Sequence, residues 1–138
     1  MASEVRLAER ARRPGDAAKG WVPSIEFDLI ADGETVGVLT LRLGDTEHLR
    51  RFGGHVGYRV EPEHQGRGYA ARGLSLLLDI ARAQGFAELV ITCNPDNLAS
   101  RRTAERAGAE LVEIVDLPST TDMYARGERR KCRYVVRL

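Results

Sequence analysis

The segment that most constrains this chain is 56–70, where a short apolar strand gives way to a glycine-rich turn and then to a helix. Within it, Gln65, Gly68 and Ala70 fit the pattern Gln/Arg-x-x-Gly-x-Gly/Ala. At the start of such a helix, several backbone N–H groups lack partners and point to one spot, reinforced by the positive end of the helix dipole. Small residues also let a ligand approach the backbone closely. The pattern therefore predicts a binding site for an anion such as a pyrophosphate.

The remaining sequence predicts a strand-rich first half followed by alternating helices and strands. Apolar–polar alternation and short apolar runs predict strands at 24–30, 35–43, 55–61, 89–93, 110–115 and 131–137. Helical spacing predicts one helix over about 66–84 and a second from Asp96 or Asn97 to about Ala107. Residues 1–23 carry both strand and helix signals, and 118–130 is a polar loop. We therefore expect one α/β domain over residues 1–138, a mixed and mostly antiparallel sheet with helices packed on it.

Charge and composition exclude several classes of function. The 21 basic and 20 acidic residues give a net charge of +1, which argues against a nucleic-acid or membrane-surface binder. No apolar run approaches membrane-spanning length, so the expected location is the cytoplasm. Cys93 and Cys132 fall in two predicted strands and are expected to be buried thiols that neighbour each other in a sheet. The histidines and cysteines show no metal-ligand spacing, so we expect no metal site.

The glycine turn has other interpretations, and the surrounding residues decide among them. It lacks the Gly-Lys-Ser/Thr ending of a P-loop and the third glycine of a dinucleotide fingerprint. The strand before it ends in Arg59-Val60-Glu61-Pro62-Glu63, and a second motif, Asn94-Pro-Asp-Asn-Leu-Ala-Ser100, opens the second helix. Together these segments resemble motifs A and B of the GNAT superfamily, the acyl-CoA-dependent N-acyltransferases. The resemblance covers about residues 25–116 and is nearest to the ribosomal-protein N-terminal acetyltransferases.

This resemblance implies a GNAT fold whose sheet splays between strands four and five, with acetyl-CoA filling the gap. Backbone groups of the fourth strand would pair with the pantetheine arm, and N–H groups of the glycine turn would hold the pyrophosphate. Gln65 and Arg67 would add side-chain contacts, and Asn97 would bond the arm near the thioester. The implied cofactor-binding residues are Tyr58, Arg59, Val60, Gln65, Gly66, Arg67, Gly68, Tyr69, Ala70, Asn97 and Ser100.

The catalytic residues implied by the resemblance are Ser100 and His55. Many members protonate the departing thiol with a tyrosine on the second helix, but that position here is Ala104. Members resembling the ribosomal-protein enzymes carry a serine where Ser100 stands, which makes Ser100 the predicted thiol-side donor; otherwise it satisfies backbone groups in the first helical turn. Tyr134 is the alternative acid.

His55 is the predicted general base, because a neutral imidazole accepts a proton near pH 7. In related sequences the same position, before Val/Ile-Gly-Tyr, often carries a glutamate. The alternative is a histidine hydrogen-bonded within the sheet. Glu26 and Glu61 are the further candidates for the base.

The resulting hypothesis is an N-acetyltransferase that moves an acetyl group from acetyl-CoA directly to a primary amine of a small molecule, peptide or protein. A non-catalytic acyl-CoA-binding regulatory module on the same fold is the alternative. Relatives usually place two helices between the first and second strands, and the 23 residues before Ser24 are too few for a strand and both helices. We therefore expect an acceptor site that is open or completed by a second subunit, and we predict a homodimer.

Overall fold

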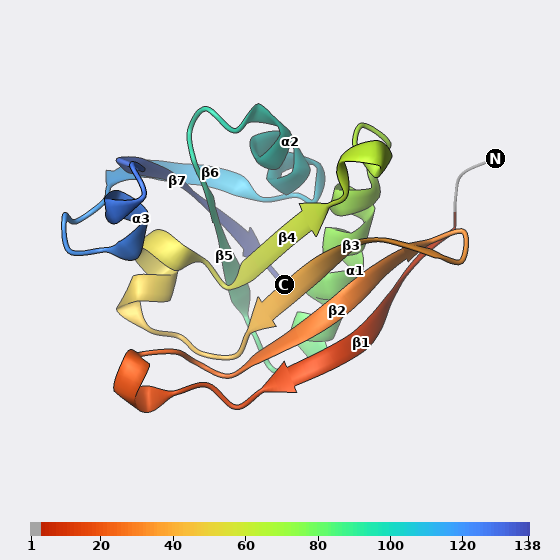
Figure 1. The fold of residues 1–138 in the computed structure, drawn as a ribbon, viewed down its shortest axis with the longest axis horizontal. Coiled ribbons are helices and arrows are strands. Elements are labelled where there is room, and N and C mark those ends of the chain that lie inside the picture. Colours follow the sequence, from red (N-terminus) through yellow and green to blue (C-terminus); the bar gives the residue numbers. More distant parts are fainter. Residues whose placement is uncertain (1–3) are drawn as a thin grey trace.

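The computed structural model describes residues 4–138, which form two antiparallel sheets around one long helix (Figure 1). The strands are β1 (Val5–Arg13), β2 (Ser24–Ala31), β3 (Glu34–Arg42), β4 (Val56–Val60), β5 (Glu88–Cys93), β6 (Glu110–Asp116) and β7 (Arg130–Arg137). The α-helices are α1 (Tyr69–Ala83), α2 (Leu98–Arg106) and α3 (Asp122–Ala125). Three short helical turns complete the elements: η1 (Ala17–Lys19), η2 (Leu49–Gly53) and η3 (Pro62–His64).

The strands pair in the orders β1-β2-β3-β4 and β5-β7-β6, and every pairing within them is antiparallel. β4 and β5 start close together near the centre of Figure 1 and diverge towards their C-terminal ends. The predicted splay between the fourth and fifth strands is therefore present, and the predicted α/β class is confirmed.

Apolar residues on alternating strand positions and on one helix face build the core. In β2 every second residue is buried, beginning with Ile25, Phe27 and Leu29, which fits the period of two of a strand with one face on the core. α1 buries Leu74, Leu77, Leu78 and Ala81 against this face, as the helical spacing predicted. The helix therefore covers one side of the β1–β4 sheet and fixes the position of the loop before it.

Several boundaries differ from the sequence prediction for local reasons. α1 begins at Tyr69 rather than 66, because Gly66 and Gly68 have φ angles of 81° and 77°, outside the helical region. Residues 5–13 form a strand paired with β2, which resolves the ambiguity of the N-terminal region. Between β1 and β2 lies the three-residue turn η1, which confirms the reduced helical region. The four-residue helix α3, capped by Thr121, lies in the predicted loop.

Within residues 4–138, no helix is long and apolar enough to cross a membrane.

His55, the residue before β4, joins the two sheets at the point where they begin to part. Its backbone N–H donates to the Val90 carbonyl at 2.7 Å, and the Val90 N–H donates to His55 Nδ1 at 2.9 Å. The His55 carbonyl accepts from the Arg42 N–H at 2.7 Å and continues the β3–β4 ladder. An imidazole nitrogen therefore accepts from Val90, the third residue of β5, in the place of a backbone carbonyl.

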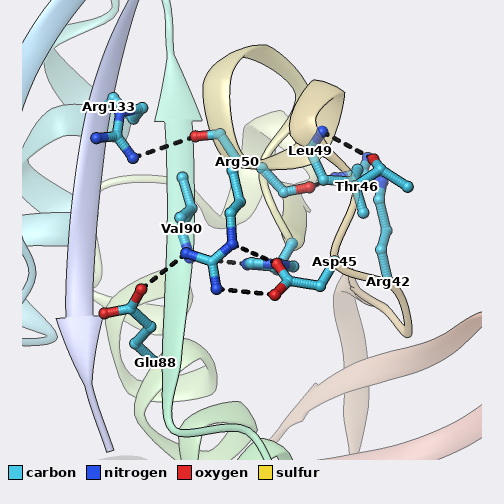
Figure 2. Close-up of polar contacts among 10 residues, drawn as sticks. Arg42, Asp45, Thr46, Leu49, Arg50, Glu88, Val90 and Arg133 are labelled. Atoms are coloured by element: carbon cyan, nitrogen blue, oxygen red, sulfur yellow. Dashed lines mark hydrogen bonds and ion pairs between the residues drawn. The ribbon is translucent and has the colours of Figure 1, made fainter.

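The surroundings of His55 keep its ring neutral. The side chain is fully buried, and Nε2 lies 3.3 Å from Asp45 Oδ1. Because Nδ1 accepts from Val90, the ring proton belongs on Nε2 and is donated to Asp45. Figure 2 shows Arg50 between Asp45 and Glu88. The Arg50 guanidinium donates a hydrogen bond of 2.9 Å to Asp45 and one of 2.7 Å to Glu88. The pKa of His55 is lowered mainly by burial, which outweighs the attraction of Asp45.

We expect His55 to make the stability of the protein depend on pH. The folded state lowers the pKa of His55, so the unfolded chain gains this proton first as the pH falls, and the free energy of unfolding decreases. Between pH 7.5 and 5.5 the wild type should lose stability, by at most about 1.4 kcal/mol per pH unit for one proton. His55→Asn keeps an acceptor for the Val90 N–H but cannot titrate, so its stability should change much less.

Urea unfolding of both proteins at several pH values measures the effect. His48→Asn, at an exposed position on the same loop, is the matched control and should follow the wild type. His55→Ala leaves the Val90 N–H without its acceptor and should lower stability by roughly 1–3 kcal/mol. Equal pH dependence in the wild type and His55→Asn would contradict this role.

Candidate cofactor-binding site

A cleft of about 540 Å³ opens where β4 diverges from β5. Its walls are β4, the loop after it, the first turn of α1, and α2. The lining residues are Tyr58, Arg59, Val60, His64, Gln65, Gly66, Gly68, Tyr69, Ala70, Ala71, Asn97, Ala99, Ser100, Arg102, Thr103 and Arg106. The residues predicted to bind the cofactor therefore come together at one cleft, except Arg67, which does not line it. Their function stays a prediction.

The start of α1 presents backbone donors to this cleft. The first intrahelical hydrogen bond runs from the Arg72 N–H to the Gly68 carbonyl at 3.2 Å, so the N–H groups of Ala70 and Ala71 precede the helical ladder. Gly68 is the N-cap residue, and no side chain among the described residues caps the helix. A Cβ at Gly66 or Gly68 would meet no atom within 4 Å, so the space in front of this backbone is open. The loop thus has the geometry of an anion site.

The Gln65 side chain holds this loop to the end of β4. Its Nε2 donates to the Val60 carbonyl at 2.9 Å, which spans the turn of η3. The sequence predicted a contact from Gln65 to the pyrophosphate, whereas the structure directs its amide N–H to the protein backbone. Gln65 therefore holds the glycine-bearing turn, and the backbone N–H groups at the start of α1 are the candidate donors to an anion.

Arginines of α2 line the opposite wall, and the sequence prediction missed them. Arg102 and Arg106 are four residues apart, so they lie on one face of the helix. Neither forms an ion pair or a side-chain hydrogen bond within the part of the chain that the structure describes. The spacing of four between the two arginines, on the helix that follows motif B, was the available signal. Arg59 also lines the cleft but lies 3.7 Å from Glu61, so Arg102 and Arg106 are the arginines that make the cleft locally positive in a chain of nearly zero net charge.

Tyr58 and Ser100 meet at the inner end of the cleft. The Tyr58 hydroxyl lies 2.8 Å from Ser100 Oγ and 3.0 Å from the Ser100 carbonyl oxygen. Asn97 caps α2, because its Oδ1 accepts from the Ser100 N–H at 3.1 Å. Burial raises the pKa of Tyr58 to about 12, so its hydroxyl stays protonated at neutral pH. The pair supplies hydroxyl protons at one point of the cleft wall, and the Tyr58 side chain was not foreseen in this role.

His55 does not line the cleft, and its geometry argues against the predicted role as general base. Nδ1 already accepts from the Val90 N–H, and Nε2 faces Asp45. Neither ring nitrogen therefore has a lone pair directed towards an acceptor amine. The alternative given by the sequence, a histidine hydrogen-bonded within the sheet, is the one that the contacts describe.

The other candidate acid and bases are engaged elsewhere. The buried Tyr134 hydroxyl donates to Glu105 at 2.9 Å and accepts from Arg101 at 3.1 Å. Glu26 is bonded by Arg13, and Glu61 lies 3.7 Å from Arg59. None of these three side chains lines the cleft. No group of three or more histidine, cysteine or acidic side chains among residues 4–138 is placed to hold a metal ion.

A larger cleft of about 710 Å³ lies between the β1–β2 connection, η2 and α3, and contains none of the predicted site residues. Its four arginines already have partners: Arg12 donates to Glu9, Arg13 to Glu26, Arg126 to Glu128, and Arg42 to the Gly53 and Gly54 carbonyls. The residues predicted to bind the cofactor therefore line the smaller cleft and not this one.

Solved structures with the same fold include several acetyltransferases. One is the microcin C7 self-immunity acetyltransferase MccE in complex with acetyl-CoA and AMP (20% identity, 83% of this chain and 61% of that one, TM-score 0.65). A second is the ribosomal L7/L12 α-N-protein acetyltransferase RimL in complex with CoA, which forms a disulfide with a cysteine of that enzyme (20% identity, 88% of this chain and 64% of that one, TM-score 0.66). A third is the ribosomal-protein-S5-alanine acetyltransferase of Vibrio fischeri (18% identity, 83% of this chain and 61% of that one, TM-score 0.65).

At these identities the likeness shows the fold, and the chain spans less than two thirds of the length of each of these three proteins. No curated protein matches the sequence. Residues 2–110, however, match the acetyltransferase (GNAT) domain family. The predicted motifs, the splayed sheets and this match agree, and the chain belongs to the GNAT acetyltransferase family.

Proposed function

We propose that this protein is an N-acetyltransferase that uses acetyl-CoA. The observation that carries the proposal is the continuity of one cleft, from the exposed N–H groups of α1 to the hydroxyl pair of Tyr58 and Ser100. The end at α1 suits a pyrophosphate, and the end at Tyr58 and Ser100 suits a thiol. Related folds have been solved with acetyl-CoA and AMP or with CoA bound, which supports the same ligand here.

The residues present fit this cofactor at three points. Ala70 and Ala71 would donate backbone N–H groups to the pyrophosphate, and Gly66 and Gly68 leave room for it. Arg102 and Arg106 would bind the remaining phosphate charge. Along the wall, β4 pairs with β3 alone among the described strands, so its other edge would offer backbone groups to the pantetheine amides.

Acetyl-CoA would supply an activated acetyl thioester whose thiol departs when the amine is acylated. Ser100 would then donate a hydrogen bond to the departing sulfur, and Tyr58 would hold the Ser100 hydroxyl in place through the 2.8 Å contact. Because the pKa of Tyr58 is about 12, the pair keeps its protons across the neutral range. We assign the thiol-side role to Ser100, as the sequence predicted.

The acceptor is proposed to be a primary amine with a low pKa. No predicted base has a free lone pair in the cleft, so the amine would arrive neutral or lose its proton to water. At pH 7 roughly a tenth of an α-amino group is neutral, against roughly one in 2,500 lysine side chains. An N-terminal amine of a peptide or protein therefore fits this site better than a lysine. The homodimer and the cytoplasmic location stay predictions.

The missing base also favours one alternative function, an acyl-CoA-binding regulatory module without turnover. Calorimetric titration with acetyl-CoA, with ATP as the comparison, tests the cofactor site. Thiol release with peptides of free and blocked N-termini then separates the two functions. Micromolar acetyl-CoA binding with release only from free N-termini supports the enzyme. Binding without release from any amine supports the module, and no acetyl-CoA binding refutes both.

We expect Gly68→Val to abolish acetyl-CoA binding. The side chain would occupy the open space in front of the α1 N-terminus and keep a phosphate from the backbone donors. Gly33→Val is the matched control, because Gly33 has a similar φ of 82°, equally open surroundings, and a position in the β2–β3 turn. Both changes impose left-handed strain of about 1–2 kcal/mol. Calorimetry should show lost binding only for Gly68→Val; retained affinity would mean that the anion site is misplaced.

Arg102→Gln and Arg106→Gln should each weaken acetyl-CoA binding about three- to tenfold, because each removes one exposed charge–phosphate contact. Binding of acetyl-pantetheine, which lacks these phosphates, should not change. Arg6→Gln on β1, also exposed, is the control for loss of one positive charge. An equal effect of all three changes would show that only net charge matters, and the α2 wall would then have no specific role.

Ser100→Ala should lower kcat about 100-fold while leaving the affinity for acetyl-CoA within a few-fold, because a positioned proton donor acts mainly in the transition state. Tyr58→Phe removes the hydroxyl that orients Ser100 and should lower kcat by a smaller factor. In the double variant the losses should be less than multiplicative, since both residues act through one hydrogen bond. Steady-state kinetics with thiol detection measure this, and an unchanged kcat for Ser100→Ala would exclude the assignment.

A further inference from the structure

The larger cleft, between the β1–β2 connection, η2 and α3, comes close to the cofactor cleft at β4. Arg42 lines the larger cleft, and a Cβ at Gly57 would lie 3.3 Å from Arg42 Nη2, so the guanidinium lies over this glycine. The next residue of β4, Tyr58, lines the cofactor cleft. Consecutive side chains of a strand point to opposite faces. The Arg42 guanidinium and the Tyr58 side chain therefore lie on opposite faces of β4, one residue apart.

Arg42 differs from the other three arginines of this cleft in its burial and in its partners. Arg12, Arg13 and Arg126 are exposed, and each donates to a glutamate. Arg42 is half-buried, and its Nη1 donates to two backbone carbonyls at the end of η2, at 3.3 and 3.0 Å. No carboxylate within residues 4–138 pairs with it. The two carbonyls fix the position of the guanidinium and leave its charge without a counterion.

A charge in this setting favours a carboxylate as its ligand. Burial lowers the pKa of the Arg42 guanidinium, but an arginine remains protonated at neutral pH. Water and salt screen a half-buried charge less than an exposed one, so Arg42 attracts an anion more strongly than its exposed neighbours do. The planar guanidinium also matches the two oxygens of a carboxylate.

The other walls of the cleft indicate what else the ligand contains. Trp21 is 63% exposed here, and further apolar side chains come from the β1–β2 connection, η2 and α3, namely Val22, Leu49 and Met123. Two carboxylates also line the cleft: Asp16 accepts from the Ala18 N–H, and Asp122 is exposed. A cleft of about 710 Å³ with apolar walls and one uncompensated guanidinium suits a short peptide segment better than an inorganic anion.

We propose that the larger cleft holds the N-terminal segment of a peptide acceptor, and that Arg42 selects acceptors with an acidic side chain near the reacting amine. The proposal rests on the proposed function, in which the acceptor is an N-terminal amine. A carboxylate bound by Arg42 would lie over Gly57 and bring the amine towards the free edge of β4, one residue from Tyr58. Arg42 is thus a specificity-determining residue for the proposed transfer.

The test uses pairs of tryptophan-free peptides that differ only in aspartate or asparagine at their second, third or fourth residue. Trp21 is the single tryptophan of the chain, so its emission reports whether this cleft is occupied. In the presence of CoA, the aspartate peptide should bind at least about fivefold more tightly than its asparagine partner at one of these positions, because a hydrogen bond between two charged groups is stronger than one to a neutral amide. Thiol release from acetyl-CoA should show the same preference in kcat/KM.

Arg42→Gln should lower this preference at least about threefold, because an amide keeps a donor for the η2 carbonyls but carries no charge. Arg42→Lys, which keeps the charge, should retain most of the preference. Arg12→Gln removes a bonded arginine from the same cleft and is the matched control, which should behave as the wild type. The preference is a ratio of two peptides on one protein, so a partial loss of folded protein does not change it.

Several results would overturn the proposal: Trp21 emission that responds to none of the peptides, no aspartate preference of this size at any position, a smaller loss in Arg42→Gln, or an equal loss in Arg12→Gln. The two readouts distinguish this proposal from the proposed function. Thiol release without an aspartate preference leaves the transfer standing and refutes the selectivity of Arg42. An aspartate preference in binding without thiol release from any peptide refutes the transfer and supports the carboxylate site at Arg42.

Discussion

The hydrogen bond from the Val90 N–H to His55 Nδ1 is the interaction on which the architecture of this protein depends. It joins the start of β4 to the third residue of β5, and within residues 4–138 β5 forms its backbone ladder with β7. No backbone ladder between β4 and β5 follows this junction in the described part of the chain. The edge of β4 therefore stays available from Tyr58 to Val60, where the cleft begins. A buried polar side chain thus sets where two sheets separate.

The cleft gains a positive potential without a basic protein around it. Most arginines in this chain are bonded to carboxylates or carbonyls, as Arg50 is to Asp45 and Glu88 in Figure 2. Arg102 and Arg106 have no such partner within residues 4–138, and they line the same cleft as the N-terminus of α1. Local charge of this kind attracts an anionic ligand at short range, whereas the net charge of +1 produces little long-range attraction.

The fold and the cofactor loop could be predicted from the sequence because their signals are local. Gly66 and Gly68 predict a turn because glycine readily adopts positive φ angles. Asn97 predicts a helix cap because its side chain can accept a hydrogen bond from the first turn. The role of His55 could not be predicted, because it depends on Val90, which is 35 residues away, and on the side of the sheet that the ring faces. Arg67 and Arg102 illustrate the same limit: both are arginines near a motif, and only the tertiary arrangement decides which one lines the cleft.

Ser100 is the residue on which the proposed transfer chemistry depends. A serine hydroxyl has one proton to donate, and its hydrogen-bonded neighbour on the cleft wall is the Tyr58 hydroxyl. If Tyr58 donates to the Ser100 carbonyl or Oγ, the Ser100 proton is left for a sulfur in the cleft. Burial keeps Tyr58 protonated at neutral pH, so Tyr58 can remain the donor to Ser100 while Ser100 serves the end of the cleft where a thiol would depart.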